Sequence, residues 1–304
     1  MPATLSAVTH ALKCIGCTTI LRGLPITGKC PECGTPVMST LVETLDMPSQ
    51  SLVQLRHPRR VGRGLLTVGA GVLLWTASTT APAVGRALAE LIAGHAANDS
   101  LADHLGVSLA FVGAALIAIG SIQLSRRDDP ILVAESGNAG RWLMAGVGIW
   151  LLGSTAILVA TVGGAERFVR ISTDGITFAA LAVQLLGSAI AAIGVRTFVT
   201  VLGGRCRRFR HAGTARQSIE TMVIAGAITL VCSLASTVVL GLGHHDLSLV
   251  LRVIAFITGG LLLMGAGYLV VNFGWIRQRL IAPPPSLESV VRVIGLDSPA
   301  ESSN

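Results

Sequence analysis

The sequence predicts an all-α membrane bundle of six transmembrane helices, preceded by a small N-terminal β zinc ribbon. Hydrophobic residues make up 51% of the 304 residues and charged residues only 13%, whereas a soluble domain averages about 25% charged residues. Long apolar segments recur along most of the chain, and two Cys-x2-Cys pairs lie near its start. The first two observations predict the bundle, and the third predicts the ribbon.

Six segments are long and apolar enough for a helix that crosses a bilayer, which takes about 20 residues. They are residues 64–81, 105–124, 142–163, 176–202, 219–242 and 249–276. We expect Pro82 to end the first span, because proline disrupts a helix interior. The apolar positions within residues 84–97 predict a separate amphipathic helix at the outer interface.

Basic residues predict the orientation of the spans, because they concentrate in cytoplasmic loops. The net charge is +7, and arginine supplies nearly all of the positive charge. The side that holds both termini carries Arg56, Arg59, Arg60, Arg63, Arg126, Arg127, Arg141, Arg205, Arg207, Arg208, Arg210, Arg216, Arg277, Arg279 and Arg292. The opposite side carries Arg86, Arg167, Arg170 and Arg252. We therefore expect a bacterial inner-membrane protein with both termini in the cytoplasm and the lipid bilayer as a partner. We also expect that the chain has no signal peptide.

A glycine spacing recurs in alternate spans. Residues 113–120, 187–194 and 260–267 each begin and end with glycine. Two interpretations stay open: a two-helix hairpin used three times, or chance similarity between helices rich in alanine and glycine.

The cysteine spacing predicts a metal site. It is Cys14-x2-Cys17-x12-Cys30-x2-Cys33, and two such pairs on tight turns surround a tetrahedral zinc ion. Gly16, Pro31 and Gly34 are residues that such turns favour. Because all four ligands are cysteines, no coordination position is left for water, so we expect one structural Zn²⁺ ion.

The ribbon around these cysteines is expected to be small. Residues 18–29 predict a β-hairpin that turns at Arg22–Gly23, and residues 35–43 predict a third strand. Residues 12–43 are too few to bury a sizeable core, so we expect the metal to stabilise this segment.

Residues 14–37, CIGCTTILRGLPITGKCPECGTPV, resemble the short zinc ribbons at the N-termini of many bacterial membrane proteins, most of them uncharacterised. The matching residues besides the cysteines are Leu21, Gly23, Leu24, Gly28, Pro31 and Gly34. Thr18 and Thr19 stand where that pattern commonly has glycine and an aromatic residue. The resemblance implies bound zinc and a cytosolic module, without implying an activity.

These patterns divide the chain into four parts. We expect the zinc ribbon over residues 1–43, a linker over 44–60, the six-helix domain over 61–281 and a flexible cytoplasmic tail over 282–304. Within the tail, residues 286–295 predict a short helix.

The favoured function is non-enzymatic: the ribbon docks a cytosolic protein partner, and the bundle anchors or scaffolds the complex. No residue is assigned a catalytic or cofactor-binding role. Nucleic acid is not expected as a partner, because the first 74 residues contain no aromatic side chain that could stack on a base.

Two alternatives stay open. A transporter or channel with a regulatory ribbon predicts a water-lined path or a central cavity near Gln184, the one clearly polar residue in the middle of a span. A membrane enzyme predicts that the outer-loop residues His244, His245 and Asp103 come together. The spans have no central carboxylate, which argues against a proton-coupled transporter.

Overall fold

The computed structural model describes residues 6–46, 52–93, 100–162, 173–212, 218–283 and 290–293. The chain forms two compact units, of which the first is Met1–Val53 with Ala282–Asn304 and the second is Gln54–Ile281. The second unit contains six helices long and apolar enough to cross a membrane. The predicted fold class is confirmed, and the chain is a multi-pass membrane protein.

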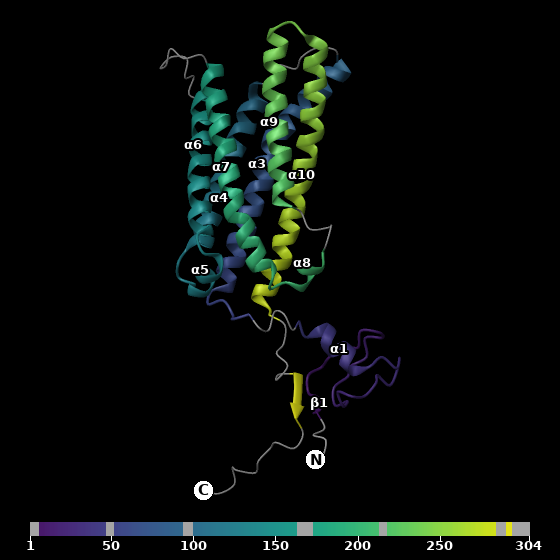
Figure 1. Ribbon diagram of the computed structural model, residues 1–304. Helices are drawn as coiled ribbons and strands as arrows, with labels where there is room; N and C mark the ends of the chain where they lie inside the picture. Colours follow the sequence, from purple (N-terminus) through teal and green to yellow (C-terminus); the bar gives the residue numbers. More distant parts are fainter. Residues whose placement is uncertain are drawn as a thin grey trace. The chain divides into compact units, whose positions relative to one another are not determined.

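The long helices of the second unit run side by side (Figure 1). They are α3 (Pro58–Ala93), α4 (Ser100–Ser125), α6 (Ala139–Val162), α7 (Thr173–Gly203), α9 (Ile219–Gly241) and α10 (His245–Ile281). Two short helices, α5 (Pro130–Ser136) and α8 (Arg207–His211), connect α4 to α6 and α7 to α9. Each long helix contains most of one predicted span. We call the end of the bundle where α3 begins and α10 ends the proximal end, and the other the distal end.

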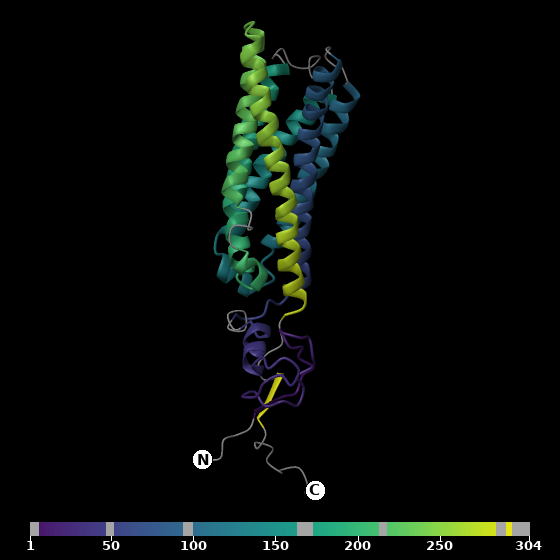
Figure 2. The ribbon, with the colours of Figure 1, turned by 90° about the vertical axis from the view of Figure 1, so that its right-hand side faces the viewer.

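Helices that follow one another in the chain form hairpins: α3 with α4, α6 with α7, and α9 with α10. Helix α10 packs along α3 (Figure 2), and α4 packs along α6. The helices therefore form a ring in the order α9, α10, α3, α4, α6, α7. The ring closes between α7 and α9, where the contact is much smaller than between the other neighbours.

The prediction that Pro82 ends the first span is wrong, because α3 continues through Pro82 to Ala93. Proline removes one helical hydrogen bond, but membrane helices tolerate it where Ser and Thr side chains and neighbouring helices satisfy the backbone. The turn before Pro82 carries Ser and Thr side chains, whose hydroxyls bond to backbone carbonyls one turn earlier. Ser78 Oγ donates to Leu74 O at 2.6 Å, and Thr80 Oγ1 donates to Thr76 O at 2.7 Å. Of the separate amphipathic helix expected over residues 84–97, the part up to Ala93 belongs to α3.

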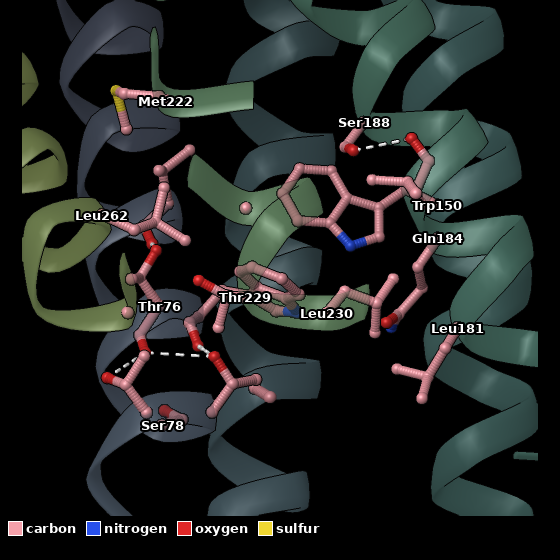
Figure 3. A pocket seen from close by; sticks show the side chains of 18 of the residues that line it. Thr76, Ser78, Trp150, Leu181, Gln184, Ser188, Met222, Thr229, Leu230 and Leu262 are labelled. Carbon is pink, nitrogen blue, oxygen red and sulfur yellow. Dashed lines mark hydrogen bonds between the residues drawn. The ribbon is translucent and has the colours of Figure 1, made fainter. Parts of the chain in front are cut away.

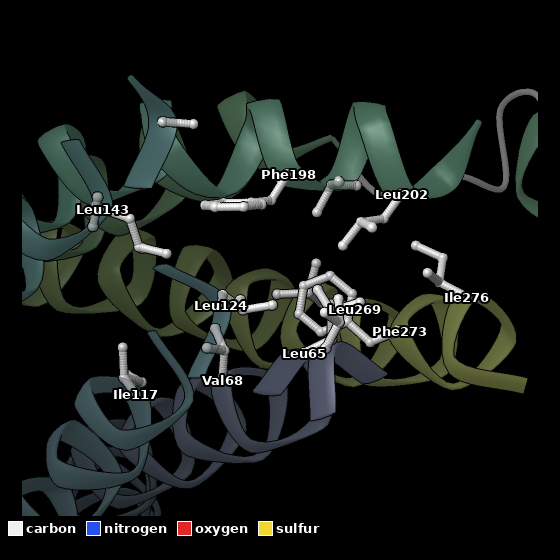
Figure 4. Close-up of a cluster of buried hydrophobic side chains, with 14 of the residues drawn as sticks. Leu65, Val68, Ile117, Leu124, Leu143, Phe198, Leu202, Leu269, Phe273 and Ile276 are labelled. Carbon is white, nitrogen blue, oxygen red and sulfur yellow. The ribbon is translucent and has the colours of Figure 1, made fainter. Parts of the chain in front are cut away.

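The hydrophobic core of the bundle lies toward its proximal end. Leu65 of α3, Phe198 of α7 and Phe273 of α10 are fully buried and meet there (Figure 4). Many large apolar side chains elsewhere on the bundle are exposed, including Leu152 and Leu261. An exposed apolar surface of this kind suits contact with lipid.

Glycines allow the backbones of the first two hairpins to touch. A Cβ atom on Gly71 of α3 would lie 2.7 Å from the carbonyl oxygen of Gly113 in α4. In the next hairpin, a Cβ atom on Gly146 of α6 would lie 2.7 Å from the carbonyl oxygen of Gly187 in α7. These distances are shorter than any real Cβ contact, so only glycine fits at Gly71 and Gly146 without a shift of the backbone.

The third hairpin does not share this packing. A Cβ atom on Gly260 or Gly267 of α10 would meet no atom of another segment within 4 Å. The glycine spacing therefore marks a common packing geometry in the α3–α4 and α6–α7 hairpins, whereas in α9–α10 the same spacing has no such role.

Two buried polar contacts fix the loops at the proximal end. The Asp129 carboxylate, fully buried, accepts from Leu132 N at 3.3 Å, from Arg56 N at 2.8 Å and from His57 N at 3.2 Å. It thereby caps α5 and holds the chain just before α3.

Arg205, which follows α7, makes the second contact. Its Nη2 atom donates to both carboxylate oxygens of Glu135 in α5, at 2.7 and 2.8 Å. Arg205 is one of the arginines that predict the orientation of the spans, and it is 9% exposed and paired within the protein.

The first unit contains β1 (Ser6–Val8), α1 (Val37–Thr44) and β2 (Val291–Val293). The third strand predicted for residues 35–43 is wrong, because Val37–Thr44 is helical. Val37 and Leu41 lie one turn apart on α1 and are buried in the core of this unit, which a strand could not achieve. The hairpin predicted for residues 18–29 does not form a ladder, and the unit has isolated bridges such as Lys13 with Ile20.

The end of the chain forms part of this first unit. Strand β2 pairs antiparallel with β1, with Ala7 opposite Arg292. Thr9 N donates to Val290 O at 2.8 Å, and the Val290 side chain is fully buried in the core around Cys14 and Cys30. Within the segment predicted as a helix, residues 286–295, the structure has strand β2, so the expected ribbon and tail share one unit.

Candidate functional site

The four cysteines at the start of the chain form one cluster. The Sγ atoms of Cys14, Cys17, Cys30 and Cys33 all lie within 4.8 Å of one another. Two of the distances, Cys14 to Cys33 and Cys17 to Cys30, are 3.5 Å. Sulfurs around a tetrahedral zinc ion with bonds of about 2.3 Å lie about 3.8 Å apart. The cluster can therefore hold a metal ion of this kind.

Two turns of the same geometry present the cysteines. The matching hydrogen bonds are Thr18 N to Cys14 O and Gly34 N to Cys30 O, both 2.9 Å, and Cys14 N to Thr19 O and Cys30 N to Thr35 O, both 2.8 Å. The residue after each pair has a left-handed backbone, with φ of +64° at Thr18 and +71° at Gly34. Glycine adopts this conformation readily, whereas a β-branched residue is strained in it.

Gly16 is required for space in the first turn. A Cβ atom there would lie 2.6 Å from Thr35 Oγ1 and 3.1 Å from Cys33 Sγ. The Gly16 N–H also lies 3.4 Å from Cys14 Sγ and donates to it. This hydrogen bond is the largest of the effects that lower the pKa of the Cys14 thiol to about 6, and it favours the thiolate form that a metal ligand needs.

The thiols do not share one electrostatic environment. The Cys33 N–H favours the Cys30 thiolate, but burial and the neighbouring thiols of Cys17 and Cys33 outweigh it and raise the pKa of Cys30 to about 11. Four thiols this close cannot all ionise easily without a cation between them, which is the situation that a divalent metal ion resolves.

A cavity of about 860 Å³, partly open to the outside, lies among the helices of the bundle (Figure 3). All six long helices line it, mainly with aliphatic and aromatic side chains. Val68 and Leu269 belong both to its lining and to the proximal core, so the packed core bounds the cavity on the proximal side. Ligand pockets of drug-sized molecules have about 300–1,000 Å³ and a similar, largely apolar lining.

Gln184 lines this cavity, as the transporter or channel alternative predicts. Its Nε2 atom donates to Ser154 Oγ at 2.8 Å, and Ser154 Oγ donates to the Trp150 carbonyl oxygen at 3.0 Å. Because the Ser154 proton is used in that second bond, its oxygen must accept from the Gln184 amide, which fixes the orientation of the amide.

Two tryptophans lie beside this polar group. The rings of Trp75 in α3 and Trp150 in α6 meet edge to face, with centroids 5.0 Å apart and planes at 85°. Trp150 is 8% exposed, and its Nε1 atom has no hydrogen-bond partner among the described residues. Sequence reasoning did not assign a role to Trp150 or Ser154. The available signal was the set of polar and tryptophan side chains in several spans at similar depth.

Two arginines lie in the long helices α7 and α10. Arg252 of α10 lines the cavity. Arg196 of α7 forms an ion pair with Glu220 of α9, with Nε and Oε1 2.8 Å apart. This pair joins the two helices whose contact is otherwise small.

The outer-loop residues of the enzyme alternative form no group in the part of the chain that the structure describes. His244 and His245 are exposed at the distal turn between α9 and α10. The side chain of Asp103 lies outside the described part. Within that part, the four cysteines are the one group of His, Cys, Asp or Glu side chains that could hold a metal ion.

Comparison of the chain with protein-family models, curated proteins and solved structures finds no match.

Proposed function

We propose that this protein is a membrane-embedded binding protein or carrier for an apolar molecule of the bilayer, which occupies the cavity inside the six-helix bundle. The cavity is the observation that carries the proposal. A bundle whose only task is to anchor a ribbon gains nothing from a large internal space, because empty apolar space costs packing energy.

The chemistry of the lining indicates the class of molecule. Apolar side chains such as Phe111, Leu185 and Leu262 predominate, and the polar groups among them are mostly neutral hydroxyls, with one amide and the single guanidinium of Arg252. Ions and strongly polar solutes need compensating charges or many hydrogen bonds, which such a lining does not supply. A lipid-like molecule matches it.

The small contact between α7 and α9 suggests how such a molecule reaches the cavity. Both helices line the cavity, and their exposed outer surfaces carry apolar side chains such as Leu186 and Val231. An opening between α7 and α9 would lead to the hydrocarbon of the bilayer, and the Arg196–Glu220 ion pair would hold its proximal end closed.

The zinc ribbon has a separate role in this proposal. One structural Zn²⁺ ion binds Cys14, Cys17, Cys30 and Cys33, and the ribbon faces the cytoplasm of a bacterial inner-membrane protein whose termini are both cytoplasmic. The four-cysteine ligand set supports zinc, since it leaves no position for water. The concentration of arginines beside the termini supports the orientation.

Docking of a cytosolic protein to the ribbon is a second candidate function, because one feature of α1 favours it. Val37 and Leu41 are buried, but Met38 and Val42 on the other side of α1 are 50% and 60% exposed. A helix that is apolar on both faces suits burial of its outer face against a partner.

The test of the cavity compares two glycine variants. Gly226→Phe would fill the cavity, since Gly226 of α9 lines it and a Cβ atom there meets nothing closer than 3.8 Å. Gly260→Phe is the control, because Gly260 is exposed on α10 with open space around it and does not line the cavity.

The full-length proteins would be purified in mild detergent, and bound molecules would be identified by native mass spectrometry. We expect the wild type and Gly260→Phe to retain an apolar molecule that Gly226→Phe lacks. Equal retention by all three proteins would overturn the proposal.

A further inference from the structure

The cavity is long in the direction of the helices. Its lining includes Ile219 and Ser236 of α9 and Arg252 and Leu269 of α10. In each helix these two residues are about 25 Å apart along the helix axis. This length approaches the thickness of the hydrocarbon layer of a bilayer, which is about 30 Å. The cavity therefore suits a molecule with an extended hydrocarbon chain.

The two ends of the cavity differ in polarity. At the proximal end the lining includes Val68 of α3, Val195 of α7 and Leu269 of α10, all of them apolar. At the distal end it includes Ser233 of α9 and Arg252 of α10. A molecule with a polar head and an apolar chain matches this difference when its head lies at the distal end.

Arg252 supplies hydrogen-bond donors that the serines at the distal end do not. Ser233 Oγ donates to Thr229 O at 2.7 Å, and Ser236 Oγ donates to Ser233 O at 2.7 Å, so both hydroxyl protons are engaged within α9. Arg252 is partly exposed, and its guanidinium carries five N–H groups. An interaction of Arg252 within the protein therefore leaves further donors for a bound molecule.

The charge of Arg252 indicates the sign of the head group. Among the described residues that line the cavity, Arg252 is the only one with a charged side chain. A positive charge beside apolar surface attracts an anion more strongly than it does in water, because its field is screened less. Guanidinium groups also match the geometry of carboxylates and phosphates. The distal end therefore favours an acidic head group.

We propose that the cavity binds an acidic lipid, whose carboxylate or phosphate head group pairs with the Arg252 guanidinium at the distal end and whose hydrocarbon chain extends toward Leu269. This inference rests on the proposed function and adds the head group of the bound molecule, its direction in the cavity and the residue that recognises it.

The experiment compares three probes that share one hydrocarbon chain and differ in the head group: oleic acid, oleyl phosphate and oleyl alcohol. Binding of the tritiated probes to delipidated full-length protein in non-ionic detergent would be titrated by scintillation proximity at about pH 8, where both acids are ionised.

The proteins are the wild type, Arg252→Gln, Arg252→Lys and Arg63→Gln. Arg63→Gln is the matched control, because it removes the same charge from an exposed position near the proximal start of α3 that does not line the cavity.

We expect the wild type to bind one acidic probe roughly ten- to a hundredfold more tightly than oleyl alcohol, as a hydrogen bond to a charged group allows. The tighter of the two acids distinguishes a carboxylate from a phosphate head group. Arg252→Gln should lose this preference but still bind oleyl alcohol, which also shows that its cavity is intact. Arg252→Lys should keep part of the preference because it keeps the charge, and Arg63→Gln should keep all of it.

Equal affinity of the wild type for the three probes would overturn this inference alone, as would an unchanged preference in Arg252→Gln. An equal loss of preference in Arg63→Gln would also overturn it, since the basic surface as a whole would then attract the acids. Failure of all three probes to bind the wild type would overturn the proposed function as well.

Discussion

Trp75 and Trp150 occupy corresponding positions in the first two hairpins, each four residues after the glycine at the helix contact, and their rings meet edge to face with centroids 5.0 Å apart. A Cβ atom on Gly113 would lie 2.7 Å from Trp75 N, and one on Gly187 would lie 2.5 Å from Trp150 N. The α3–α4 and α6–α7 hairpins thus repeat one packing scheme, and the two tryptophans meet where the repeats face each other.

This scheme predicts a strong dependence on glycine at the helix contacts. In Gly146→Ala the new Cβ atom would lie 2.2 Å from Ala191 N, so the helices must separate. We expect destabilisation by about 1–3 kcal/mol, the usual cost of an overpacked contact. Gly148→Ala in the same helix is the control, since a Cβ atom there meets nothing within 4 Å. Thermal unfolding in detergent measures both, and equal effects of the two variants would contradict the scheme.

The strained turn at Thr18 predicts a stabilising substitution. Thr18 has φ of +64°, which costs a β-branched residue about 1–2 kcal/mol relative to glycine. We therefore expect Thr18→Gly to stabilise the ribbon by about 1 kcal/mol, and Gly34→Thr at the matching position to destabilise it by a similar amount. Competition with a metal chelator measures both effects, since a more stable ribbon retains its metal at a higher chelator concentration. A loss of metal retention in Thr18→Gly would disprove the role of strain.

The pairing of β1 with β2 predicts that metal removal affects the end of the chain. Val290 packs in the same core as Cys14 and Cys30, so loss of the metal should loosen both strands. We expect amide exchange in residues 6–8 and 291–293 to accelerate together when a chelator is added, while exchange in α7 stays unchanged. Exchange that accelerates only near the cysteines would show that β2 is held independently of the metal site.

Substitution of the neighbouring residues Asp128 and Asp129 at the proximal end should reduce stability by different amounts. Asp129 is fully buried and accepts three backbone hydrogen bonds, so Asp129→Ala leaves buried N–H groups unpaired. We expect a loss of roughly 2 kcal/mol of stability, with partial rescue in Asp129→Asn. Asp128→Ala is the control, because the Asp128 side chain is 54% exposed and makes one ion pair with Arg60, which should contribute less than the three buried hydrogen bonds of Asp129. Thermal unfolding in detergent measures the stability of both variants. Similar losses in Asp129→Ala and Asp128→Ala would contradict the capping role of Asp129.

The pKa of Asp128 predicts a weak pH dependence of the stability of the folded protein. The Arg60 guanidinium donates to the Asp128 carboxylate at 2.7 Å and lowers its pKa. A carboxyl with a lowered pKa in the folded state contributes stability above its unfolded pKa, near 4, and loses that contribution as the pH falls through its folded pKa. We expect the difference in stability between wild type and Asp128→Ala to be present at pH 7 and to be lost as the pH falls from about 4 through the lowered pKa of Asp128. A difference that persists at low pH would point to packing instead of charge.

Sequence reasoning found the features that depend on local pattern. Span length and hydropathy suffice for the six helices, and the spacing of the cysteines suffices for their clustering. Sequence reasoning failed where contacts between segments far apart in the chain determine the structure. A strand was the prediction for the segment of α1, since the β-branched residues Val37 and Thr40 favour one. The burial of Val37 together with Leu41 favours the helix instead. The cavity could not be located from the sequence, because it depends on which helices pack closely and which do not.

The position of β2 has a consequence for the order in which the protein is made. Residues 290–293 complete a unit that begins at residue 6, and all six membrane helices lie between these two segments in the chain. The ribosome must therefore finish the last span before the ribbon can close around its core. A completed ribbon thus reports that translation has run through the entire membrane domain, and a truncated chain lacks the strand that closes it.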